Sequence, residues 1–107
     1  MQNSRFSREE AGLENLYPLE RAALEAIARQ VPDHTDALSR QLTQARVIAR
    51  RNTGAGFYTT LDTSSDDRLC GVTSPIGDVG ASVDHLQHGM GFLLWLREGR
   101  MHELEGY

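Results

Sequence analysis

The feature that most constrains the fold is the apolar run at residues 91–96 (GFLLWL). In a strand, successive side chains alternate between the two faces of the sheet. Phe92, Leu94 and Leu96 then lie on one face, and Leu93 and Trp95 lie on the other. A strand that is apolar on both faces needs a cover on both sides, so something must shield Leu93 and Trp95 from water.

The residues after this run predict a hairpin. Residues 97–100 (REGR) are typical of a turn, and residues 101–107 (MHELEGY) alternate as a partner strand should. We therefore expect 91–97 and 101–107 to pair as antiparallel strands.

Three further segments favour strands. The two glycines of NTGAG predict a turn in a second hairpin over 46–62, with Phe57, Thr59 and Leu61 on one face of its second arm. Residues 69–75 fit a short edge strand broken by its proline. Residues 76–84 alternate as a strand with one wet face.

Two helices precede these strands. Pro18 is suited to a first helical position, and the apolar residues that follow recur at three- and four-residue spacing until Pro32 ends the helix. Asp33 or Thr35 can cap a second helix. The apolar face of that helix is formed by Leu38, Leu42 and Ala45.

This order predicts an α+β fold, with two N-terminal helices followed by an antiparallel β-meander of four to five strands. The 107 residues suit one domain, which we place at 16–107 behind a polar N-terminal arm, 1–15. Two helices cover one face of such a sheet. The cover over Leu93 and Trp95 is then the arm with Phe6, a second copy, a partner, or internal packing by the first helix or sheet coiling.

Composition narrows the class of protein. A net charge of −4 disfavours broad nucleic-acid binding, and we expect the basic cluster Arg46, Arg50 and Arg51 to be a solvated strand edge. The polar N-terminus has no apolar signal segment, and the longest apolar run is too short to cross a membrane. The single cysteine, Cys70, fits a reducing compartment and a buried thiol. We therefore expect a cytoplasmic protein.

The two histidines at 85 and 88 are the candidate metal ligands. Asp84 can cap a single turn in which His85 and His88 share a face, but a closed site needs further ligands from Asp84, Glu103 or Cys70. Their spacing is a weak signal, so we predict no tightly bound transition metal and no cofactor. A capped loop is the alternative interpretation.

The closing strand holds the candidate catalytic groups. Glu103 and Glu105 point to the same face and His102 points to the other. Two carboxylates can share acid–base work if burial separates their pKa values, and His88 could join them. The alternative is that both carboxylates are solvated and protect a strand from aggregation.

Two segments carry a resemblance. NTGAGFYTTL (52–61) and GDVGASVDHLQHGMGFLLWLREGRMHELEGY (77–107) resemble a small uncharacterised bacterial domain family. The resemblance covers about 45–107 and rests on the Gly-Phe hairpin and the closing Leu-Glu-Gly-Tyr. It implies a fold and carries no activity to this chain.

Two functions from different classes fit the sequence. The first is a protein-interaction module of the immunity or regulatory type, which binds a protein partner or forms a homodimer through Leu93 and Trp95 and binds neither nucleic acid nor membrane. The second is a small hydrolase or metal-dependent enzyme that uses His85, His88, Glu103 or Glu105. Converging histidines and carboxylates in a pocket would favour the enzyme, and a flat apolar patch around Trp95 would favour the module.

Overall fold

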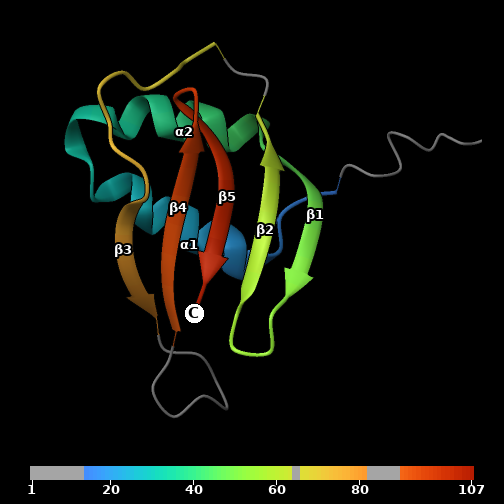
Figure 1. Cartoon of the computed structure of the whole chain (residues 1–107). Coiled ribbons are helices and arrows are strands. Elements are labelled where there is room, and N and C mark those ends of the chain that lie inside the picture. The colour runs from blue at the N-terminus through green and yellow to red at the C-terminus, as the bar shows by residue number, and fades with distance from the viewer. Residues whose placement is uncertain (1–13, 64–65, 82–89) are drawn as a thin grey trace, which may run out of the picture.

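The computed structural model describes residues 14–63, 66–81 and 90–107. Two helices precede five antiparallel strands, and both helices pack on one face of the sheet (Figure 1). The α+β class and the order of helices before strands are confirmed. None of the described helices is long and apolar enough to span a bilayer.

The first helix, α1, spans Pro18–Arg29 and begins at the predicted proline. Its buried stripe differs from the expected one, because Glu20 is buried while Leu19 is exposed. A short 3-10 turn, Pro32–His34, leads into α2, Thr35–Gln44. Neither Asp33 nor Thr35 caps α2 as predicted. The Thr35 hydroxyl instead donates to the carbonyl oxygens of Ala28 and Val31, which ties the two helices together.

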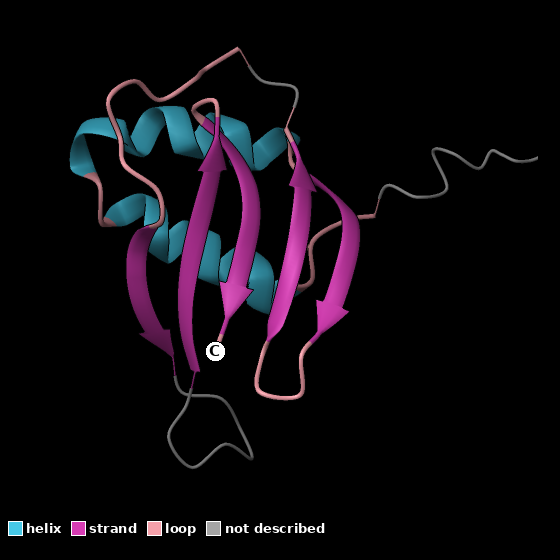
Figure 2. Cartoon of the chain, in the orientation of Figure 1, coloured by secondary structure: helices cyan, strands magenta, loops and turns pink. Residues whose placement is uncertain are grey.

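The strands are β1, Arg46–Asn52; β2, Phe57–Asp62; β3, Ile76–Ala81; β4, Met90–Arg97; and β5, Arg100–Gly106. Their order across the sheet is β1-β2-β5-β4-β3 (Figure 2). The chain leaves β2, crosses to the opposite edge, and returns through β3 and β4. The last strand in sequence therefore lies in the middle of the sheet.

The connection that leads to β3 differs in two respects from what the sequence predicts. Residues 69–75 do not form the predicted edge strand. The Leu69 N–H donates to the Gly99 carbonyl oxygen in the β4–β5 turn, and the proline at 75 has no N–H to donate to a neighbouring strand. Cys70, expected to be a buried thiol, is exposed in this connection.

The predicted hairpin at the end of the chain is confirmed. Phe92 pairs with Gly106 and Leu94 with Leu104 across β4 and β5. The turn between them has φ of 53° at Glu98 and 77° at Gly99, so both central residues have the positive φ of a type I′ turn, which matches the twist of the strands.

The hydrophobic core lies between the sheet and the helices. Phe92 and Leu94 are fully buried, as the alternation of residues 91–96 predicted. They pack with side chains of the same sheet face and of both helices, including Met101, Leu104, Leu24, Ile27 and Leu38.

One polar side chain completes this core. Gln41 of α2 is fully buried. Its Oε1 accepts from the Met101 N–H at 2.8 Å, and its Nε2 donates to the carbonyl oxygens of Asp67 and Gly99 at 2.6 and 3.0 Å. Met101 lies beyond the last β2–β5 pair, Thr60 with Glu103, so Gln41 supplies hydrogen bonds to β5 where β2 has separated from it.

Candidate functional site

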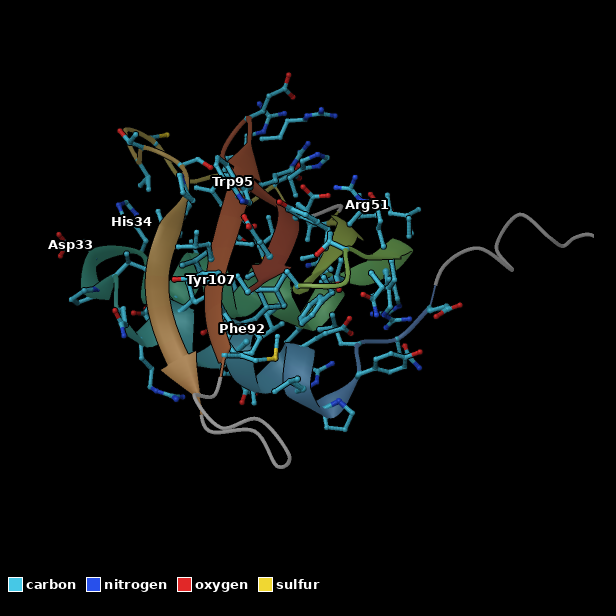
Figure 3. The ribbon with its side chains drawn as sticks, turned by 60° about the horizontal axis from the view of Figure 1, so that its bottom comes forward. Asp33, His34, Arg51, Phe92, Trp95 and Tyr107 are labelled. Atoms are coloured by element: carbon cyan, nitrogen blue, oxygen red, sulfur yellow. The ribbon has the colours of Figure 1, made fainter. Side chains whose placement is uncertain are left out.

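The face of the sheet away from the helices is the candidate site, and we call it the open face. Figure 3 shows Trp95 and Arg51 on this side and Phe92 on the helix side. Strand register assigns its residues. They include Arg51, Tyr58, Thr60, Leu93, Trp95, Glu103, Glu105 and Tyr107.

Trp95 is the most prominent apolar group on the open face. Its side chain is large, and the residue is 37% exposed. Its indole Nε1–H donates to Glu105 Oε1 at 2.9 Å, which fixes the ring against the sheet. Leu93 is half-buried beside it. Both residues lie on the face where the alternation predicted them, and no described helix covers that face.

Glu105 lies at the centre of a three-strand hydrogen-bond network. Tyr58 on β2 donates its hydroxyl to Glu105 Oε2 at 3.2 Å, while Trp95 on β4 donates to the other oxygen. The carboxylate on β5 therefore joins two aromatic side chains from the neighbouring strands. Such fixed rings lose little conformational freedom when they are covered.

Glu103 extends this negative surface. It lies directly between Thr60 on β2 and Trp95 on β4. The Thr60 hydroxyl donates to Glu103 Oε2 at 3.3 Å. In the part of the chain that the structure describes, this is the one hydrogen bond of the Glu103 carboxylate, so Glu103 Oε1 can still accept from a partner.

The direction in which the pKa of Tyr58 is shifted shows which charges dominate around its hydroxyl. The charge of Glu105 raises the pKa of Tyr58, and desolvation and the hydrogen bond to Glu105 act in the same direction. The guanidinium of Arg51, 4.6 Å from the centre of the Tyr58 ring, lowers it. Because the net shift is upward, the carboxylates outweigh Arg51 at this point on the open face.

The apolar surface continues toward the C-terminal end of β5. Tyr107 exchanges two backbone hydrogen bonds with Gly91, and its ring lies over Gly91, where a Cβ would come within 2.5 Å of Tyr107 Cζ. Glycine at 91 thus makes room for an aromatic ring on the open face next to Leu93.

The predicted acid–base and metal groups are only partly brought together. Glu103 and Glu105 share the open face, as predicted. His102 is the extra residue of a β-bulge, since Trp95 pairs with Glu103 and Leu96 with Met101. Asp84, His85 and His88 lie outside the described residues. Within the described ranges, no group of three or more His, Cys, Asp and Glu side chains could hold a metal.

A second polar cluster was not foreseen from the sequence. Glu20 is 3% exposed. Both Nε and Nη2 of Arg50 donate to its carboxylate, at 2.8 and 2.9 Å. The Thr59 hydroxyl and the Tyr17 N–H also donate to it, each at 2.7 Å. The expectation that Arg50 is a solvated edge residue is therefore wrong.

A β-bulge at Ile48 explains this error. Val47 pairs with Leu61, but the next pair is Ala49 with Thr60. The extra residue, Ile48, is left 48% exposed, and the alternation downstream is reversed. Arg50 consequently turns to the helix side and meets Glu20, while Arg51 turns to the open face.

A cavity of about 370 Å³ adjoins this cluster, between the start of α1, the end of β1 and the start of β2. Its walls include Tyr17, Leu19 and Phe57. The polar groups at its floor are already engaged, because each Glu20 oxygen accepts two hydrogen bonds and the Arg50 guanidinium lies 3.6 Å from the centre of the Tyr17 ring. The cluster therefore holds α1 to the sheet.

Comparison of the chain with family models, with curated proteins and with solved structures yields no match.

Proposed function

We propose that this chain is a protein-binding module that docks a partner protein on its open face. The observation that carries the proposal is Trp95. A large, partly exposed ring is held in one orientation by Glu105 and lies next to Leu93, on a face that no described helix covers and that also carries Tyr107. Fixed aromatic side chains of this kind dominate the binding energy of protein interfaces.

The charges on the open face favour a different protein over a second copy. β5 is the middle strand. Two copies stacked face to face about a two-fold axis through the sheet centre would place β5 against β5. Glu103 and Glu105 would then meet the same carboxylates of the other copy, and this repulsion opposes a homodimer. Regulatory or inhibitory binding of a partner is the role that we infer for the module.

Removing the Trp95 ring tests the proposal. We expect Trp95→Ala to weaken partner binding by about 2 kcal/mol, roughly thirtyfold in affinity, because the variant removes a large, partly exposed ring that a partner would cover. Affinity capture from the host cell, with each retained protein then titrated in purified form, measures this loss. Circular dichroism should show that the variant stays folded.

The matched control is Ile48→Ala. Ile48 is also an exposed apolar residue of the sheet, but it projects from the β1 bulge. A partner that Trp95→Ala loses and Ile48→Ala retains supports docking on the open face. Equal retention by both variants would overturn it. Light scattering that shows a wild-type dimer, dissociated by Trp95→Ala, would identify a second copy as the occupant instead.

A further inference from the structure

The open face also indicates the chemistry of its partner, an inference that rests on the proposed function. Glu103 and Glu105 are neighbours on the same face of β5. Trp95 on β4 lies opposite Glu103, and Tyr58 on β2 lies opposite Glu105. We propose that the open face receives an arginine side chain of the partner, with its guanidinium between the Glu103 carboxylate and the Trp95 ring.

The hydrogen bonds leave room for this cation. Glu105 is already bound by Tyr58 and Trp95. Glu103 accepts from Thr60 alone among the described residues, and through one oxygen. The Trp95 ring, which lies directly across from Glu103, has no cation over it in the described part of the chain. A guanidinium there would gain a charge-assisted hydrogen bond and a cation–π contact together.

The chain itself provides one example of both contacts together and a second example of the cation–π contact alone. Arg50 lies 3.6 Å from the centre of the Tyr17 ring while it donates to Glu20. Arg51 lies 4.6 Å from the centre of the Tyr58 ring on the open face. The second example occupies the Tyr58 ring from within the chain, which leaves the Trp95 ring for a partner.

Arginine suits this site better than lysine. Its flat guanidinium can stack on an indole ring and direct its N–H groups sideways to a carboxylate, whereas an ammonium group is a compact point charge. The apolar surroundings, Leu93 and Trp95, also suit a partner that presents its arginine among apolar side chains.

A pair of short peptides tests the inference. The probes are acetyl-Leu-Arg-Leu-amide and the same peptide with citrulline, which keeps the shape of arginine and removes its charge. The chain contains one tryptophan, so its fluorescence and its indole N–H resonance report this site alone. At low salt we expect the arginine peptide to bind about fivefold more tightly than the citrulline peptide, and added salt should reduce the difference.

Two substitutions locate the effect. Glu103→Gln keeps an oxygen for Thr60 and removes the charge, so it should abolish the preference for arginine. Glu98→Gln removes the same charge in the exposed β4–β5 turn and should leave the preference intact. Equal binding of the two peptides, or no response of Trp95 to either, would overturn the arginine site. Equal binding would leave the docking of apolar groups on the open face standing, so the two proposals fail separately.

Discussion

We expect Glu20→Ala to lower the free energy of unfolding by about 3–5 kcal/mol, as is usual when one partner of a buried ion pair is removed. The substitution strips Arg50 of its main partner and leaves the buried Thr59 hydroxyl and the Tyr17 N–H without their acceptor. Such a loss is a large fraction of the stability of a domain of this size. Urea denaturation at neutral pH measures it.

Two further variants separate the ion pair from the rest of the helix. Glu25→Ala removes an exposed carboxylate from the same helix and should change stability by less than about 0.5 kcal/mol. The double variant Glu20→Leu with Arg50→Met removes both charges but still leaves the Thr59 hydroxyl and the Tyr17 N–H without an acceptor, so it should recover only the part of the loss that comes from the unpaired Arg50 charge. A double variant as unstable as Glu20→Ala would show that the loss comes from the unpaired Thr59 and Tyr17 groups and not from the unpaired Arg50 charge.

The Glu20 carboxylate makes the free energy of unfolding depend on pH. Burial raises the pKa of Glu20 most strongly among the individual causes, but the hydrogen bonds from Arg50, Thr59 and Tyr17 together outweigh it and lower the pKa below its ordinary value of 4.5. The unfolded chain therefore binds this proton more readily than the folded one. The stabilisation by Glu20 should be complete above pH 4.5 and should disappear as the pH falls through the lower pKa of the folded state. In Glu20→Gln this part of the acid transition should be missing.

Gln41→Leu is expected to lower the free energy of unfolding by about 2–4 kcal/mol. Leucine has a similar size but leaves the buried Met101 N–H without its acceptor and removes a donor from the carbonyl oxygens of Asp67 and Gly99. Buried backbone groups left unpaired each cost about 1–3 kcal/mol. Thermal and urea unfolding measure the loss.

The position of Gln41 on α2 allows a matched control. Ser39→Ala changes an exposed residue of the same helix and should leave stability nearly unchanged. Because the side chain of Gln41 reaches β5, hydrogen exchange at Met101 should also become faster in Gln41→Leu. Unchanged exchange there would contradict the role that we assign to Gln41.

Local patterns predicted much of this fold. The alternation in residues 91–96 separates Phe92 and Leu94 from Leu93 and Trp95, and the structure places the two sets on opposite faces. Glu98 and Gly99 supply the turn between β4 and β5. These features depend on neighbours in the chain, so periodicity and turn chemistry suffice to find them.

The remaining features depend on contacts between distant segments. The bulge at Ile48 reverses the alternation of β1 and turns Arg50 toward Glu20, 30 residues away. Gln41 is polar yet buried, because its side chain accepts a hydrogen bond from the Met101 N–H of β5, 60 residues later. The hydrogen bonds from Tyr58 and Trp95 to Glu105 join three strands, so no single segment of the sequence displays them.

The strand order has a consequence for synthesis on the ribosome. β5 joins the β1–β2 hairpin to β4 and β3, yet of these five strands it is the last to leave the ribosomal exit tunnel. Until then β1 can pair only with β2, and β3 only with β4. The inner edges of β2 and β4 have no partner strand, and the helices have only part of the sheet to pack against. Unpaired edges of this kind promote aggregation of growing chains. Chaperone demand should therefore be greatest before β5 has been synthesised, and ribosomes that stop before β5 should release chains that cannot assemble the sheet.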